Sequence, residues 1–448
     1  MYARHLRLVL VALILAALSC AGPGSTPTPD RSDLATSVAA TLTSATPLEP
    51  HGTTPDIPKA PILPTITPTS PPPSVLRIVY TNGGNIWLIE GVNPPTQLTS
   101  SGGADQVLIS SDGMKVAFIR HVPIDGQAEI RSVNIDGSGE TTLLSPAQFD
   151  SLYPLCDFLH HDLSSIAFVP GTHNLMLNTR AISEGPGLIK HDDLLLLDAD
   201  TGIFTTLFSP GSGGDFLLSP DGSQAAIITP DGISLINRDG TNLRPNLVTY
   251  APVITYSEFQ YYAQPVWAPD SGALGVAIPS PDPFVPTTTG TIWRIPAYGG
   301  SPMNMGTISG GFYFSQPPGS CLLSYNLNRV AFLRDTATTN IHDLYLANAN
   351  GSGETLYATG DIQWVGWSPD NTHFIYSLSS PMSLHLGVDG GAPTPIGSCS
   401  QLEWIDNTQF LCLSGSYGAW TLMRGEISGG LIPIVSPAGN FVSFDLDA

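Results

Sequence analysis

The sequence is poor in charged residues, and above all in basic ones. Only 12% of its 448 residues are charged, and 16 Lys and Arg stand against 37 Asp and Glu, so the formal net charge is −21. No run of Lys or Arg occurs anywhere in the chain. A nucleic-acid-binding protein neutralises phosphates with such residues. The composition therefore argues against nucleic acid as a partner.

Long helical patterns and a serine nucleophile motif are also missing. No long stretch repeats its apolar residues with the 3.6-residue period of a helix, so we expect a protein almost without helices. No Gly-x-Ser-x-Gly motif is present, and we expect no α/β-hydrolase domain in this chain. Gly (45) and Pro (41) are plentiful instead, which favours a turn-rich all-β protein with an additional Pro-rich segment.

Residues 1–20 have the pattern of an export signal. Arg4 and Arg7 precede an apolar run over 8–18, which is too short for a comfortable membrane span. The run ends in "LSCAG", which resembles the processing site of bacterial lipoproteins, although the residues before Cys20 fit that pattern imperfectly. We expect export, with Cys20 lipidated at the outer face of the cell membrane and no transmembrane helix. Ordinary secretory cleavage and an uncleaved anchor are the alternatives.

Residues 21–74 are predicted to be a disordered, semi-rigid tether, because Pro, Thr and Ser dominate stretches such as "ILPTITPTSPPPS". A brief helix over 33–46 is the one element expected there. The signal and tether together hold four basic and four acidic residues, so the charge of −21 belongs to residues 75–448. An acidic body of this kind is soluble and self-repelling, and we expect a monomer.

From residue 75 onward the sequence repeats itself. Four segments share an apolar strand, a turn containing Asp, and a second apolar strand: 108–120, 217–229, 266–278 and 366–378. Each is followed by another strand and turn, and weaker copies fill the gaps. The result is about eight units of roughly 36–60 residues, each with four short strands. Such units predict the blades of a β-propeller, eight in number, or seven if one weak unit is an elaborated loop.

The two ends of residues 75–448 complement each other. The first unit, 77–99, lacks its leading strand, whereas the chain ends in a solitary strand, "NFVSFDLDA". We expect the C-terminal strand to complete the first blade and close the ring. A pair of β-sandwiches is the alternative, but it leaves this complementarity unexplained.

The repeats resemble those of TolB-like β-propellers, a WD-repeat-like family also found as the non-catalytic domain of prolyl oligopeptidases. The family's repeat begins Trp-Ser-Pro-Asp-Gly and ends Leu-Thr. Trp267, Trp367 and Trp404 occupy or approach its Trp position, and "QLT" at 97–99 matches its end. The resemblance covers essentially all of 75–448. It implies a rigid disc that usually binds something, and it implies no catalytic residues.

Strand order divides such a disc into two faces. If the strands of a blade are named a to d from the axis outward, the short Asp-Gly turns join a to b and c to d on one face. The long connections all fall on the opposite face: 120–129, 145–163, 180–193, 249–265, 279–290 and 334–342. Connections longer than blade closure needs are often functional. We therefore expect this loop-rich face to bind a partner.

The loop-rich face holds an aromatic stretch, "YSEFQYY". Tyr256, Glu258, Phe259, Tyr261 and Tyr262 are candidate binding residues, because exposed aromatic side chains are common in protein and carbohydrate recognition. The alternative is that the rings anchor this loop onto neighbouring blades. Our first hypothesis is a lipid-anchored binding module with a protein or glycan partner at the cell envelope and no cofactor.

The second hypothesis is a metal-assisted polysaccharide lyase or hydrolase. His160, His161 and His191 are weak candidates for metal ligands, since imidazole and neighbouring carboxylates suit a transition metal. His121 and His342 are predicted on the same face, but no spacing fixes convergence of these residues. "LDADTG" at 197–202 imitates the start of a calcium loop and lacks its distal ligands, so we interpret it as a turn.

The remaining cysteines allow one defined pairing. Cys399 and Cys412 flank a predicted hairpin, nearly opposite each other, where an exported protein could form a cross-strand disulfide. Cys156 and Cys321 lie in irregular connections. Buried free thiols are the alternative for these residues.

Overall fold

The computed structural model describes residues 75–121, 126–154, 159–182, 188–253, 261–282, 288–310, 322–379 and 382–447. The predicted signal, the tether, Cys20, Cys156 and Cys321 lie outside these ranges. Residues 75–448 form one unit by their internal contacts. No described helix has the length and apolar character required to cross a membrane.

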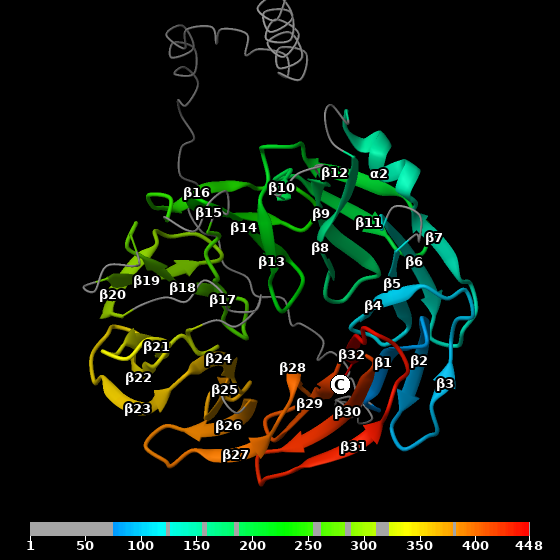
Figure 1. Cartoon of the computed structure of the whole chain (residues 1–448). Helices are drawn as coiled ribbons and strands as arrows, with labels where there is room; N and C mark the ends of the chain where they lie inside the picture. The colour runs from blue at the N-terminus through cyan, green and yellow to red at the C-terminus, as the bar shows by residue number, and fades with distance from the viewer. Residues whose placement is uncertain are drawn as a thin grey trace, which may run out of the picture. The chain divides into compact units, whose positions relative to one another are not determined.

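Eight antiparallel sheets follow one another around a ring (Figure 1), and we number them blades 1 to 8. From inner to outer strand, blade 1 consists of β32 (Phe444–Asp447), β1 (Arg77–Asn82), β2 (Asn85–Glu90) and β3 (Thr96–Gln97), and blade 2 of β4 (Ala104–Ile109), β5 (Lys115–His121), β6 (Ala128–Asn134) and β7 (Thr141–Leu144). Blade 3 consists of β8 (His160–Phe168), β9 (Asn174–Ile182), β11 (Leu194–Asp198) and β12 (Phe204–Phe208), and blade 4 of β13 (Asp215–Leu218), β14 (Gln224–Thr229), β15 (Gly232–Asn237) and β16 (Arg244–Thr249). Blade 3 also holds the short β10 (Leu188–Lys190), paired with β9.

Blades 5 to 8 continue the ring in the same order. Blade 5 consists of β17 (Val266–Trp267), β18 (Ala273–Pro279), β19 (Thr289–Pro296) and β20 (Met303–Ser309), and blade 6 of β21 (Arg329–Asp335), β22 (His342–Asn348) and β23 (Thr355–Gly360). Blade 7 consists of β24 (Ile362–Trp367), β25 (His373–Ser379), β26 (Met382–Val388) and β27 (Thr394–Gly397), and blade 8 of β28 (Ser400–Trp404), β29 (Gln409–Ser416), β30 (Ala419–Glu426) and β31 (Leu431–Val435). In blade 6 the inner position is marked by an isolated bridge between Leu323 and Val330.

The all-β, eight-bladed prediction is confirmed. Within the described ranges the one helix is α2 (Pro146–Leu152), in the connection from blade 2 to blade 3. Ser145 and Gln148 form a capping box at its start, which satisfies two backbone N–H groups that a helix start leaves without partners. The prediction of a protein almost without helices therefore holds for these residues.

The core lies between neighbouring blades. The second strand of each blade is covered on both sides, and β18 is buried along its whole length. This is why such strands carry almost continuous apolar runs, as in "ALGVAIP" and "QAAIIT", and not the alternating pattern of a half-exposed sheet. One core cluster joins Ile119 of blade 2 to Leu177 of blade 3, and similar clusters join the other blades.

The turn "SPDG" at 219–222 is an architectural element. The Ser219 hydroxyl donates to Asp221 at 2.6 Å, and the Ser223 backbone N–H donates to the same carboxylate at 3.0 Å. Partial burial alone would raise the pKa of Asp221, but these hydrogen bonds hold it well below its ordinary value. Gly222 has a positive φ of 65°, and a Cβ there would collide with the Pro170 carbonyl of blade 3. The turn thus sets the spacing of adjacent blades.

The C-terminal strand closes the ring as predicted. β32 is the inner strand of blade 1 and pairs antiparallel with β1, from Arg77 opposite Asp447 to Tyr80 opposite Phe444. It also contacts blade 2, because the Asp445 carboxylate accepts from the Ile109 N–H at 2.8 Å. One strand therefore joins the last blade, the first and the second.

The sequence left open whether Cys399 and Cys412 form a disulfide or are buried free thiols, and the structure contains the disulfide. It links the residue before β28 to β29, so it ties the inner strand of blade 8 to its neighbour. Cys399 and Cys412 are both buried within the core of this blade.

Because Phe444 lies in the strand that closes the ring, we expect its substitution to lower the stability of the domain. We expect Phe444→Ala to lower the free energy of unfolding by about 3 kcal/mol, because it empties a buried site in the closing strand. Urea unfolding followed by fluorescence measures this change. Phe441→Ala is the matched control, since Phe441 lies in the same segment and is 69% exposed. Equal effects of the two variants would contradict a special role for the closing strand.

Candidate functional site

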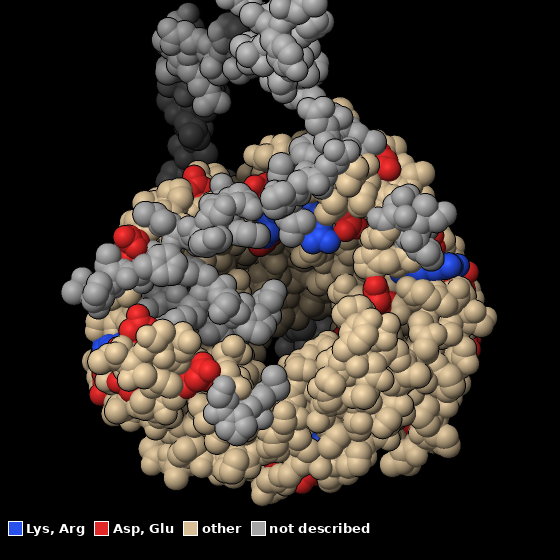
Figure 2. Space-filling model, in the orientation of Figure 1, with Lys and Arg blue, Asp and Glu red and all other residues tan. Residues whose placement is uncertain are grey.

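The strand order places the long connections on one face, as expected. The b–c connections and the links from one blade to the next leave the ring on the same side, opposite the Asp-Gly turns. Figure 2 shows one face of the ring, with a hollow at its centre and acidic side chains scattered around it. The candidate site lies on the loop-rich side, between blades 4 and 5.

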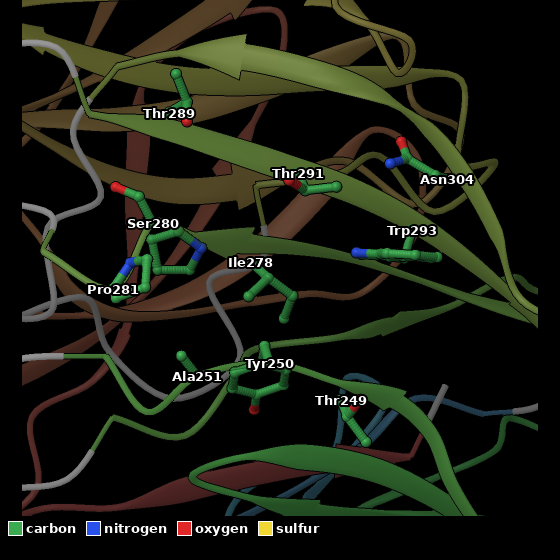
Figure 3. Close-up of a pocket in the computed structure, with 11 residues that line it drawn as sticks. Thr249, Tyr250, Ala251, Ile278, Ser280, Pro281, Thr289, Thr291, Trp293 and Asn304 are labelled. Atoms are coloured by element: carbon green, nitrogen blue, oxygen red, sulfur yellow. The ribbon is translucent and has the colours of Figure 1, made fainter.

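A pocket of about 400 Å³ opens there. The end of β16 and the residues after it form one wall, and blade 5 forms the other (Figure 3). Its lining consists of Thr249, Tyr250, Ala251, Ile278, Pro279, Ser280, Pro281, Thr289, Thr291, Trp293 and Asn304. This volume lies in the range of small-molecule sites, about 300–1,000 Å³.

Period-2 alternation explains how blade 5 supplies one wall. Successive side chains of a strand point to opposite faces. Thr289, Thr291 and Trp293 therefore share one face of β19 and line the pocket, whereas Gly290 and Ile292 are buried on the other face. The segment "TGTIWR" thus combines a core face and a polar-aromatic face.

Several polar groups of this wall are free to bind. Among the described residues, the indole N–H of Trp293 and the hydroxyls of Thr249, Thr289 and Thr291 make no hydrogen bond. By contrast, the indole N–H of Trp267, on the inner strand of the same blade, donates to the Leu217 carbonyl at 3.0 Å. A buried tryptophan normally satisfies its N–H in this way.

A hydrogen bond from Tyr250 fixes the opposite wall of the pocket, which the end of β16 and the residues after it form. The Tyr250 hydroxyl donates to the Thr229 carbonyl at 2.9 Å, and burial raises the pKa of Tyr250 above its ordinary value. Tyr250 is therefore a neutral phenol over the physiological range. It is also the only ionisable side chain among the eleven lining residues, so the described lining carries no formal charge.

Two of the candidate tyrosines, Tyr261 and Tyr262, belong to the same core cluster as residues of the pocket. Tyr261 and Tyr262 are half-buried and pack, with Tyr250 and Trp293, against the core between blades 4 and 5. The Tyr262 hydroxyl donates to Asp192 of blade 3 at 2.9 Å. These contacts correspond to the anchoring alternative for the two tyrosines.

The other members of the predicted patch, Tyr256, Glu258 and Phe259, lie outside the described residues. The chain enters this segment just after the pocket residues Tyr250 and Ala251. Their proposed role in binding therefore stays a prediction.

Two of the histidine candidates come together. The rings of His161 and His191 lie 4.8 Å apart between centroids, and Tyr153 contacts His191 at 5.1 Å. His160 is the neighbour of His161 on β8, so its side chain points to the other face of the strand. The remaining two histidines have separate partners, since His121 contacts Asp105 and His342 contacts Asp335.

Hydrogen bonds fix the proton on each ring of the pair. The Thr179 hydroxyl donates to the buried Asp193 carboxylate at 2.7 Å, so His191 Nδ1–H must donate to that hydroxyl, at 2.6 Å. His161 Nε2–H donates to the Tyr153 carbonyl at 3.2 Å. His161 Nδ1 is buried without a partner among the described residues.

The surroundings shift the pKa of one ring of this pair, that of His191. Burial lowers the pKa of His191, and the nearby His161 lowers it further. In the described ranges no group of three or more His, Cys, Asp and Glu residues is arranged to hold a metal ion.

Sequence reasoning missed the pocket itself. The alternation of Thr289, Thr291 and Trp293 on a strand that also carries buried residues was the available signal. Thr249 and Asn304 carried no signal, because their approach to β19 depends on how blade 4 packs on blade 5.

The fold defines an eight-bladed β-propeller domain. No family model and no curated protein sequence matches the chain. Solved structures similar to it include an oligogalacturonate lyase in complex with manganese, with 16% identity and a TM-score of 0.43 over 68% of this chain and 82% of that chain. A dipeptidyl peptidase 4 from Porphyromonas gingivalis has 13% identity and a TM-score of 0.45 over 77% and 56% of the two chains.

A putative TolB from Agrobacterium tumefaciens is also similar, with 12% identity and a TM-score of 0.32 over 57% of this chain and 97% of that chain. The structures similar in fold thus include TolB, lyase and peptidase propellers, in line with the resemblance of the repeats. At these identities the similarity concerns the fold alone.

His191 should make the domain sensitive to acid. The pKa of His191 is lower in the folded state, so below about pH 6.5 the unfolded chain binds more protons and stability falls. We expect His191→Gln to lose less stability than the wild type between pH 7.5 and pH 5.5, as measured by urea unfolding at both pH values.

His173→Gln is a control of opposite sign. Burial opposes protonation of His173, but Asp200 and Asp112 raise its pKa, so protonated His173 stabilises the fold in acid. This variant should lose more stability on acidification than the wild type. A loss in His191→Gln equal to that of the wild type would contradict the assignment for His191.

Proposed function

We propose that this chain is an exported binding module, anchored by lipid on Cys20 at the outer face of the cell membrane. Its propeller presents the loop-rich face to a protein or glycan partner at the cell envelope. The export pattern of residues 1–20 supports this location, and the Pro-rich residues 21–74 provide a spacer that would hold the domain away from the membrane.

The pocket between blades 4 and 5 is the observation that carries the proposal. Water satisfies isolated polar groups on any protein surface, but a concave site with aromatic walls and several polar groups without internal partners is characteristic of ligand binding. Three lining residues, Thr249, Tyr250 and Ala251, lie at the start of the blade connection in which the sequence suggested a binding patch.

A blocked pocket should abolish partner capture. We expect Thr289→Arg to prevent recovery of the partner from intact envelopes, because Thr289 is exposed at the pocket and the longer side chain would occupy it. Capture by the full-length tagged chain, followed by identification of bound protein and glycan, measures this effect.

Ile203→Arg is the matched control for this substitution. Ile203 is 69% exposed and lies in a turn on the opposite face, so the same charge is added away from the pocket. Its capture should equal that of the wild type. Unchanged capture by Thr289→Arg, with both variants folded, would refute the pocket as the binding site.

The alternative function is a metal-assisted polysaccharide lyase or hydrolase, and the proximity of His161 and His191 is the observation in its favour. A metal needs further ligands, and the described residues supply no third His, Cys, Asp or Glu in a suitable arrangement.

We expect elemental analysis of the purified full chain to find no stoichiometric transition metal. Partner capture should likewise be unaffected by a chelator. A stoichiometric metal that is lost in a His161→Gln, His191→Gln double variant would favour the enzyme and count against a simple binding module.

A further inference from the structure

The chemistry of the pocket between blades 4 and 5 specifies its ligand further. We propose that it binds an uncharged saccharide unit, placed against Trp293 and hydrogen-bonded by the threonine hydroxyls of the lining. This inference rests on the proposed function as a binding module, and it names the ligand class of the same site.

The described lining carries no charged side chain, which favours an uncharged ligand. None of the eleven lining residues is Asp, Glu, Lys, Arg or His. Uronic acids, sulfates and phosphates are normally bound by Arg or Lys, and cationic ligands by carboxylates. The formal charge of −21 on the chain opposes the approach of anions as well. The site therefore suits a neutral molecule.

The polar groups of the lining match hydroxyls. Each threonine hydroxyl can donate one hydrogen bond and accept others, as can each hydroxyl of a sugar. The free groups of Thr249, Thr289 and Thr291 therefore have the same dual character as such a ligand, and the Trp293 N–H adds a donor.

A purely apolar ligand fits these groups poorly. It would cover the hydroxyls of Thr249, Thr289 and Thr291 without satisfying their hydrogen bonds, which is unfavourable for each buried unpaired group. Extended peptides are bound mainly through backbone hydrogen bonds at a sheet edge. The pocket instead presents side-chain hydroxyls, which favours a glycan over a peptide.

The apolar part of the pocket matches the C–H surface of a sugar ring. Figure 3 shows Ile278 in the region between the Tyr250 ring below it and the Trp293 ring to its right, and all three line the pocket. Aromatic rings combine a large contact area with a polar end, so they bind molecules that have both C–H and O–H groups. Pro279 and Pro281 add rigid apolar surface at the b–c end of blade 5. The volume of about 400 Å³ limits the occupant to a short saccharide.

Calorimetric titration of the full chain tests this inference. The neutral probes are cello-, malto-, manno- and chito-oligosaccharides, and the acidic probe is oligogalacturonate. We expect at least one neutral probe to bind and the acidic probe not to bind. Trp293→Ala should weaken the binding of that neutral probe about tenfold or more, because a central aromatic contact is lost.

Two further variants separate binding from folding. Thr291→Val keeps the shape of the side chain and removes its hydroxyl, so it should weaken binding about 2- to 10-fold with little effect on unfolding. Tyr417→Ala is the matched control, because Tyr417 is 66% exposed in the β29–β30 turn of blade 8, on the same face and outside the pocket. It should bind like the wild type.

The outcomes distinguish the two proposals. Binding of oligogalacturonate, or neutral binding that is unchanged in both Trp293→Ala and Thr291→Val, would overturn the saccharide inference. If no neutral probe binds but Thr289→Arg still abolishes envelope capture, the ligand is not such a saccharide, and the binding module stands. If no probe binds and Thr289→Arg leaves capture unchanged, both proposals fail.

Discussion

The pairing of β32 with β1 joins residues 444–447 to residues 77–80 and turns a row of sheets into a ring. Each blade buries its faces against its two neighbours, so an open ring would expose an apolar face at both ends. The closing segment also serves blade 2, since Ser443 and Asp445 accept from the Val107 and Ile109 N–H groups of β4. The stability of every blade thus depends on a strand of four residues.

The same junction contains an acidic pair. Burial and the neighbouring Asp445 raise the pKa of Glu403, on the inner strand of blade 8, to about 9. Glu403 is therefore protonated at neutral pH and can donate a hydrogen bond to the Asp445 carboxylate, so the pair carries one negative charge where two would repel. A carboxyl group whose pKa is raised on folding favours the folded state less as the pH rises from its ordinary value toward 9. Glu403 thus lowers stability as the pH rises above the ordinary range of a glutamate, whereas His191 lowers it as the pH falls below the ordinary range of a histidine.

Much of the fold could be predicted from the sequence, because each copy of a repeat indicates the same set of strands and turns. The copies of the turn at 219–222 indicated the blades, and the unpaired first and last strands indicated the closure. Tertiary neighbours were harder to foresee. His161 and His191 are separated by 30 positions, and they meet only because β8 and β11 flank β9 in register and the chain after β10 turns back. The pocket likewise needs the end of blade 4 beside β19, and no pattern within either segment encodes that contact.

Hydrogen-bond satisfaction separates the architectural part of this molecule from the candidate binding site. On the turn face Asp221 accepts from Ser219 and Ser223, and His173 bridges Asp112 and Asp200 at 3.1 and 2.8 Å. The polar groups of these turns are thus occupied by neighbours in the same or the adjacent blade, and few remain for a ligand. In the pocket Thr291 and Trp293 project polar groups that no described residue satisfies, on a strand whose other face buries Gly290 and Ile292. The turns of this fold satisfy their own polar groups, so the polar face of β19 has no evident structural role, and the proposed ligand would give it one.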